Sequence, residues 1–143
     1  MHHPLWVLGE AGPRMNILFL STENPYPPDH GHHVRTYNML KYIALRHDVH
    51  FLGFTSNKDN LENLEPIREL CKSVDVFVLR DDVSKVRLVL SLFGNIFSGL
   101  PYVAQKYFQK DMKEKIVEIV KVNRIDIAHV DMLPLARYRN ILG

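Results

Sequence analysis

The sequence predicts an α/β fold: a Rossmann-like parallel sheet with helices on both faces. Two observations predict it. Short apolar runs alternate with segments of helical periodicity along most of the chain. The apolar runs are nearly continuous instead of alternating with polar residues, which is typical of parallel strands buried on both faces. Such an alternation of strands and helices gives right-handed crossovers and one parallel sheet.

The first part of the chain supplies two strands and the helix between them. NILFLS, residues 16–21, is a short apolar run that predicts a strand. The loop TENPYPPDHG follows, dense in turn formers, and a helical pattern then runs from about His32 to Arg46. DVHFLGF, residues 48–54, is rich in branched and aromatic residues and predicts the second strand. The apolar stripe expected on the helix is Val34, Tyr37, Leu40 and Ala44.

The second part continues the alternation. A helix is predicted over residues 60–72, after the cap residues NKDN, and a strand over 74–79. Residues 84–99 are apolar all round and predict a buried helix, with a membrane-surface contact as the alternative. An amphipathic helix over 109–124 leads into a strand over 125–130, and the tail can begin another helix. The residues expected to face inward are Leu61, Leu64, Ile67 and Leu70 in the first of these helices, and Met112, Ile116, Ile119 and Val120 in the last.

Composition and charge exclude several classes of protein. The 143 residues are the length of one domain, and 46% hydrophobic content is enough for a core. The net charge of +2 is too small to indicate a nucleic-acid surface. The single cysteine, Cys71, excludes an internal disulfide and fits a reducing compartment. We therefore expect a cytoplasmic protein, at the inner face of the membrane if the apolar segment contacts lipid.

The ends of the chain suggest its domain organisation. Residues 1–14 lack the pattern of a signal peptide, and MNILFLS begins a strand directly at Met15. We interpret residues 1–14 as a leader outside the fold and residues 15–143 as the domain. The sequence ends soon after the fourth predicted strand, whereas a doubly wound domain usually has more strands, so we expect a truncated domain. Surface exposed by truncation would favour a dimer.

The candidate site lies at the carboxyl ends of the strands. In open α/β sheets, ligands bind where the strand order reverses, which lies between strands one and four in the usual order 3-2-1-4. The loop over residues 22–31 leaves strand one there, and His129 and Asp131 lie at the end of strand four. We expect Asp131 to be exposed in this cleft and to bind a hydroxyl, with helix capping as its alternative role. His129 is either a ligand contact or a satisfied core histidine.

The start of the first predicted helix carries positively charged residues where they are usually unfavourable. A helix N-terminus carries partial positive charge, yet His32, His33 and Arg35 cluster there. A phosphate or carboxylate bound to the free amides beyond Gly31 would offset this charge, and Gly31 would permit close backbone approach. The alternative is that Asp29 or Glu23 pairs with Arg35 while the histidines are solvated.

Neither a metal nor an organic cofactor is predicted. A metal site at His30, His32 and His33 is possible, but no carboxylate or cysteine pattern in the sequence supports it. The glycine motifs of dinucleotide-binding folds and P-loops do not occur.

The stretch from Met15 to Phe54 resembles the start of retaining glycosyltransferases of the GT-B fold, group 1 (glycosyltransferase family 4-like). FSGLPYVAQKYFQKDM and IDIAHVDMLPLARY are also similar to this family, so that the resemblance covers residues 15 to about 138. His32 departs from the pattern because a second glycine usually stands in its place. The matching positions are Pro27, Pro28, Asp29, Gly31, Arg35, Leu40, His47, Asp48 and Val49.

The resemblance implies the N-terminal, acceptor-side domain of an enzyme that transfers a sugar from a nucleotide-sugar to an acceptor hydroxyl, without an obligatory metal. The acceptor would be a sugar or a lipid-linked molecule. The donor would bind a C-terminal domain that this sequence lacks, so this chain alone would be inactive. The residues expected to contact ligand are Gly31, His32, Arg35, His129 and Asp131. Two alternatives stay open: a non-enzymatic α/β ligand-binding or interaction module, and a sugar-nucleotide epimerase of the same architecture.

Overall fold

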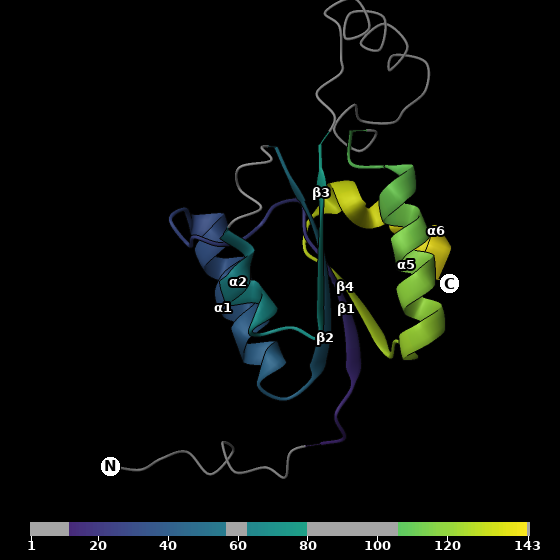
Figure 1. Cartoon of the computed structure of the whole chain (residues 1–143), viewed down its shortest axis with the longest axis horizontal. Coiled ribbons are helices and arrows are strands. Elements are labelled where there is room, and N and C mark those ends of the chain that lie inside the picture. The colour runs from purple at the N-terminus through teal and green to yellow at the C-terminus, as the bar shows by residue number, and fades with distance from the viewer. Residues whose placement is uncertain (1–11, 57–62, 80–105, 143) are drawn as a thin grey trace, which may run out of the picture.

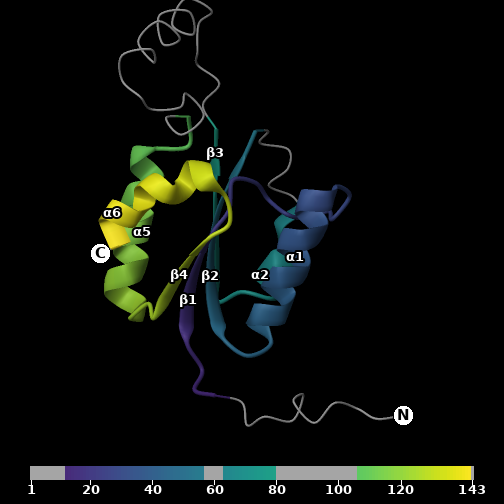
Figure 2. The same ribbon diagram turned by 180° about the vertical axis from the view of Figure 1, so that it is seen from behind.

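The computed structural model describes residues 12–56, 63–79 and 106–142, which form a four-stranded parallel sheet between two layers of helices (Figure 1). Helices α1 and α2 cover one face, and α5 and α6 cover the other, as the view from behind also shows (Figure 2). The elements are β1 (Asn16–Leu20), α1 (Gly31–Ala44), β2 (Asp48–Thr55), α2 (Glu65–Arg68), β3 (Ser73–Val78), α5 (Lys110–Asn123), β4 (Ile127–Val130), η3 (Leu133–Tyr138) and α6 (Arg139–Leu142).

The strand order is β3-β2-β1-β4, and all three pairings are parallel. At the carboxyl end of β1, Leu20 is in register with Leu52 of β2 on one side and with Val130 of β4 on the other. The predicted Rossmann-like fold and the predicted order 3-2-1-4 are therefore confirmed. From β1 the chain adds β2 and β3 on one side, and it then returns to add β4 on the other side of β1. Ligands of such sheets bind where the strand order reverses in this way.

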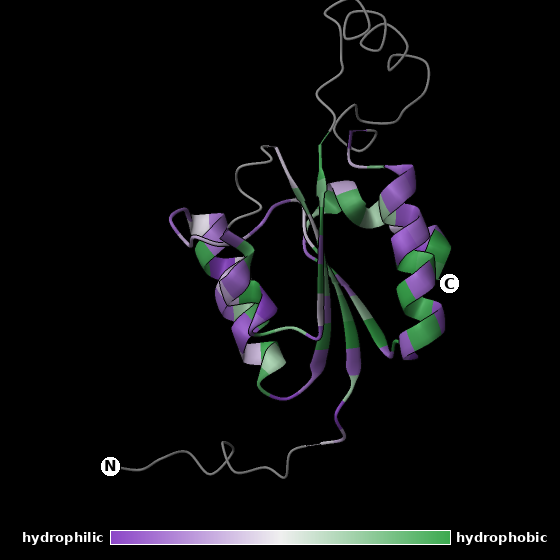
Figure 3. Cartoon of the chain, in the orientation of Figure 1, coloured by the Kyte–Doolittle hydropathy of each residue, from purple (hydrophilic) through white to green (hydrophobic). Residues whose placement is uncertain are grey.

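The continuous apolar pattern of the strands is explained by two separate cores. Leu18 and Leu20 of β1 pack on the α5 face of the sheet, whereas Phe19 packs on the α1 face. Side chains alternate between the faces of a strand, so a strand with helices on both sides needs apolar residues at every position. Figure 3 shows strands that are hydrophobic over most of their length, between helices that carry both hydrophilic and hydrophobic residues.

The tail after β4 is fastened to the α5 layer by Tyr138. This side chain is fully buried, and its hydroxyl donates a hydrogen bond to the Tyr107 carbonyl at 2.7 Å and accepts one from the Gln109 amide at 3.0 Å. Burial raises the pKa of Tyr138, so the phenol stays protonated and can donate. The further helix predicted in the tail corresponds to η3 and the short α6.

Two predicted helices differ from the structure or lie outside it. Of the helix predicted over residues 60–72, the described part contains only α2, which has proline in its first turn; Leu64 and Ile67 are buried as expected. The helix predicted over residues 84–99 lies outside the described residues. Near the N-terminus, Arg14 of the proposed leader contacts the domain through an ion pair with Asp48 at 2.7 Å.

The inward face of α1 was predicted incorrectly in one respect. Val34 is exposed, and Thr36 is fully buried together with Leu40. The helix is rotated so that Thr36 faces β4, where its hydroxyl has a polar partner. A buried hydroxyl needs such a partner, because desolvation without a hydrogen bond is unfavourable.

Among the described residues, no helix combines the length and the apolar character that crossing a bilayer requires.

A buried histidine in β2 makes stability depend on pH. His50 is 6% exposed and lies 2.8 Å from the Ser73 hydroxyl. Burial lowers the pKa of His50, an effect opposed by Asp48 and assisted by Lys72. Below a pH of about 6.5, the unfolded chain therefore binds more protons than the folded one, and stability falls on acidification until the pH passes the folded pKa.

We expect NMR titration to give His50 a pKa below the ordinary histidine value, and the stability lost in urea unfolding between about pH 7 and pH 5 to be larger in the unaltered protein than in a variant without this histidine. The His50→Gln variant should reduce this slope. A His50 pKa at or above the ordinary value would contradict the prediction.

Candidate functional site

The centre of the candidate site is Asp131, the residue that follows β4. Its amide donates a hydrogen bond to the Leu20 carbonyl at 2.9 Å, so the end of β4 is fixed beside the end of β1. The Asp131 side chain is only 1% exposed. The expectation that Asp131 lies exposed in a cleft is therefore wrong.

Both carboxylate oxygens of Asp131 are occupied by the first helix. Arg35 donates from Nη2 to Oδ1 at 2.8 Å, and Thr36 donates from Oγ1 to Oδ2 at 2.8 Å. The N-cap of η3 is Met132, and no side-chain capping bond is found there among the described residues. The alternative role of Asp131 as a helix cap is therefore not observed. Asp131 instead joins the first turns of α1 to the end of β4.

Two histidines approach the same carboxylate without reaching hydrogen-bond distance. His32 Nε2 lies 3.6 Å from Asp131 Oδ2, and His129 Nε2 lies 4.0 Å from Asp131 Oδ1. Both Nε2 atoms are buried and have no hydrogen-bond partner among the described residues. The His129 ring packs against Phe19 with centroids 4.6 Å apart, which fixes its orientation. Two ring nitrogens are thus held near one buried carboxylate with their hydrogen-bonding capacity unused.

Gly31 opens α1 but shows no conformational reason to be glycine. Its φ lies outside the positive region, and a Cβ added there would meet no atom of the described chain within 4 Å. The structure thus brings His32, Arg35, His129 and Asp131 together and places Gly31 next to them in the chain. The close backbone approach of a ligand at Gly31 stays a prediction.

The positive charge at the start of α1 is balanced by carboxylates from other segments. The first turn of α1 contains no acidic residue, and Asp131 supplies a carboxylate to Arg35. Glu23 and Asp29 were expected to be alternative partners of Arg35, but they pair with His33. His33 Nε2 lies 2.7 Å from Glu23 Oε2, and His33 Nδ1 lies 3.1 Å from Asp29 Oδ1.

These contacts shift the titration of the loop. Partial burial alone would lower the pKa of His33, but its hydrogen bonds to Glu23 and Asp29 outweigh this effect and raise the pKa. The hydrogen bond from His30, at 2.6 Å, lowers the pKa of Asp29. The loop therefore contains charge-assisted hydrogen bonds that hold the His33 ring in one orientation.

A cavity of about 520 Å³ lies at the carboxyl edge of the sheet. The loop after β1 contributes Thr22 to Asn24 and Asp29, α1 contributes His33, and the ends of β2 and β3 contribute Thr55 and Leu79. The cavity therefore lies over β1, β2 and β3. Its described lining does not include His32 or His129, which lie on the β4 side. This cavity is therefore separate from the crevice predicted between β1 and β4, which stays a prediction.

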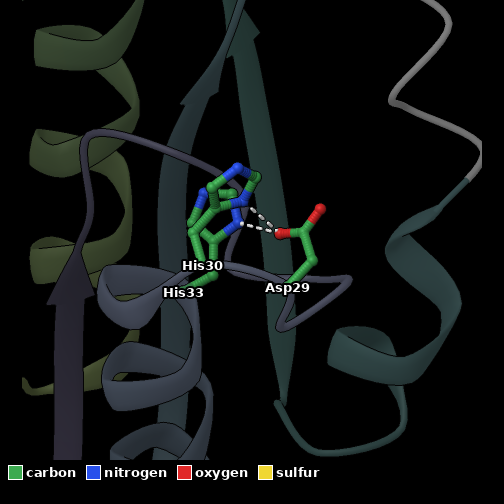
Figure 4. A group of neighbouring side chains, drawn as sticks. All are labelled: Asp29, His30 and His33. Carbon is green, nitrogen blue, oxygen red and sulfur yellow. Dashed lines mark hydrogen bonds and ion pairs between the residues drawn. The ribbon is translucent and has the colours of Figure 1, made fainter.

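The three histidines considered as a metal set are separated by the structure. His32 faces Asp131, whereas His30 and His33 both face Asp29 (Figure 4). Asp29, His30 and His33 each offer one ligand atom, and these atoms lie within 4.8 Å of one another. A carboxylate thus accompanies two histidines, although the sequence was judged to lack such a pattern.

Sequence reasoning missed Thr36 and Asn24. Thr36 was overlooked because an isolated threonine inside a helix gives no periodic signal. Asn24 is buried, and its Oδ1 accepts from the Tyr26 amide at 3.1 Å, while its Nδ2 is buried without a partner among the described residues. Asparagine in a proline-rich loop predicts a turn, and here Asn24 also lines the cavity.

Comparison with known proteins gives no match: no family model, no curated protein and no solved structure is similar enough to this chain. The function must therefore be inferred from the residues and their arrangement.

Removing the charge of Asp131 should weaken the fold. In Asp131→Asn, the carboxylate charge is lost and one of the two acceptor oxygens becomes an amide group that cannot accept, and we expect a loss of about 1.5–3 kcal/mol in the free energy of unfolding by urea. The figure is modest because Arg35 is largely exposed to solvent.

Glu114→Gln is the matched control, because Glu114 pairs with Lys110 on the surface at 3.5 Å. Its expected cost is below about 0.5 kcal/mol. Equal losses in the two variants would show that the Asp131 contacts do not stabilise the domain.

Proposed function

We propose that this chain is the N-terminal, acceptor-side domain of a GT-B retaining glycosyltransferase, and that it holds the acceptor sugar at the β1–β4 end of the sheet. The observation that carries the proposal is the pair of ring nitrogens on His32 and His129, which are buried without partners beside Asp131. They lie at the reversal of strand order, the usual ligand position in an open α/β sheet.

The chemistry of these groups suits a sugar hydroxyl. A neutral imidazole nitrogen either donates or accepts one hydrogen bond, and a hydroxyl does both. The His32 and His129 side chains are about one-quarter to one-third exposed, but their Nε2 atoms are buried, so a hydroxyl would bind these nitrogens only after the rings turn toward solvent. The proposed role of Asp131 is different from the one expected from sequence. It holds Arg35 and Thr36 of α1 through hydrogen bonds and does not itself bind the acceptor.

The parent reaction would move a sugar from a nucleotide-sugar to an acceptor hydroxyl. Catalysis would depend on placing that hydroxyl correctly and on positive groups that stabilise the leaving diphosphate. In this chain, the N-terminus of α1 and the exposed guanidinium of Arg35 are the positive groups nearest the site. The nucleotide-sugar would bind mainly to a second domain, as in the family that the sequence resembles.

The acceptor and the location follow from the same proposal. We favour a sugar or lipid-linked acceptor handled in the cytoplasm, with contact at the inner membrane face in the lipid-linked case. The single cysteine supports a reducing compartment. Burial raises the pKa of Cys71 to about 12, which keeps its thiol protonated and unreactive.

Ligand binding by the isolated chain tests the proposal. We expect hexoses and hexose phosphates to shift the NMR signals of the His32 and His129 rings, and UDP- and GDP-sugars to shift them no more than their sugar parts do. His32→Ala and His129→Ala should each weaken binding about 10-fold, the effect of one lost hydrogen bond.

His47→Ala is the control, because His47 follows the far end of α1 and accepts from the Met15 amide at 3.3 Å. It should leave binding unchanged. Tight binding of the nucleotide moiety would contradict the acceptor-side assignment and favour a nucleotide-binding enzyme such as an epimerase. Absence of any sugar binding would favour an interaction module.

A further inference from the structure

We propose that Asp29, His30 and His33 form a Zn²⁺ site on the wall of the carboxyl-edge cavity. The site is distinct from the His32 and His129 pair, and it does not depend on the proposed glycosyltransferase function. It shares His30 and His33 with the histidine set named from the sequence and has Asp29 in place of His32.

The side-chain geometry is already close to that of a metal site. The Nδ1 atoms of His30 and His33 lie 2.6 Å and 3.1 Å from the same Oδ1 of Asp29 (Figure 4). Tetrahedral Zn²⁺ with bonds of about 2.0–2.1 Å separates its ligand atoms by about 3.3 Å. To reach this separation, the 3.1 Å contact must lengthen by a few tenths of an ångström and the 2.6 Å contact by about 0.7 Å. Asp29 and His30 are exposed and free to make this adjustment.

Glu23 prepares His33 to act as a ligand. Its Oε2 lies 2.7 Å from His33 Nε2, so the carboxylate holds the ring and favours a proton on Nε2. The lone pair of Nδ1 then points toward a carboxylate oxygen of Asp29. These two groups repel each other unless a proton or a cation lies between them. Metal-binding histidines commonly donate their other ring N–H to a carboxylate in this way.

The charges of the cluster suit a divalent cation. With both imidazoles neutral, Asp29 and Glu23 together contribute two negative charges, which a divalent ion neutralises. They also counter the positive end of α1, whose first turns contain His33. Two imidazole nitrogens select a borderline metal such as Zn²⁺ over Mg²⁺ or Ca²⁺, which prefer oxygen ligands.

The position of the cluster indicates what the metal would do. All three ligands line the cavity of about 520 Å³, beside Glu23 and Asn24. Three protein ligands leave the fourth position of Zn²⁺ open, as in sites that bind an exogenous oxygen. An anionic or hydroxyl oxygen of a molecule in this cavity would complete the coordination.

The test is metal binding by the full chain in a His2→Ala/His3→Ala background, because His2 and His3 could otherwise supply ligands. Zn²⁺ affinity is measured by competition with a chromophoric chelator at about pH 8, above the ordinary pKa of histidine. Co²⁺ is added separately to report coordination by its visible absorption. We expect one equivalent of metal and the intense bands of four-coordinate Co²⁺.

Four variants locate the site. Asp29→Ala, His30→Ala and His33→Ala should each weaken Zn²⁺ binding at least about 10-fold and reduce the Co²⁺ bands. Glu23→Gln should weaken binding by about 10-fold while keeping the bands, because it removes the group that orients His33 and no ligand. Circular dichroism should remain unchanged in all four, since none of these residues belongs to the apolar cores.

His32→Ala is the matched control, a neighbouring histidine on the same helix that faces Asp131. It should bind Zn²⁺ as the background protein does. The proposal is overturned if the background protein binds no metal, if His33→Ala binds as tightly as the background, or if His32→Ala weakens binding as much as His33→Ala does.

Discussion

The carboxylate of Asp131 is the contact on which the arrangement of the candidate site depends. Strand pairing alone fixes β4 beside β1, but it does not determine how α1 is rotated about its axis. The hydrogen bonds from Arg35 and Thr36 to the two oxygens of Asp131 supply that constraint. With this rotation Thr36 is buried, Val34 is exposed, and His32 lies 3.6 Å from the same carboxylate.

The rotation of α1 also separates two groups of polar side chains. His32 and His33 are consecutive, so they point to different sides of the helix start. His32 lies on the β4 side with Asp131, and His33 lies on the cavity side with Glu23 and Asp29. One short segment thus offers a proposed sugar contact and a proposed metal ligand within one residue of each other.

Much of the fold could be predicted from the sequence because its determinants are local. Apolar runs such as NILFL indicate strands buried on both faces, and the strand order follows from general rules of α/β topology. The meeting of His129 and Asp131 with the start of α1 could be predicted for the same reason. The inward residues Met112, Ile116 and Ile119 of α5 were also found from periodicity alone.

The details of the site could not be predicted, because they depend on partners distant in the sequence. Asp131 ends an apolar strand and looks like an exposed cleft residue, and only its contacts with Arg35 and Thr36 explain its burial. Likewise, nothing local indicates that His33 rather than Arg35 pairs with Glu23 and Asp29. Side-chain pairing across a loop depends on the path of the backbone, and a proline-rich loop has no periodicity from which to infer that path.

A double-mutant cycle between Thr36→Val and Asp131→Ala, read by urea unfolding, tests the central claim most directly. Valine keeps the shape of threonine and removes the hydroxyl that donates to Asp131 Oδ2. If Asp131 fixes the rotation of α1, the two substitutions are coupled by about 1–2 kcal/mol, because each removes the same buried hydrogen bond. Additive losses, within about 0.3 kcal/mol, would contradict the claim.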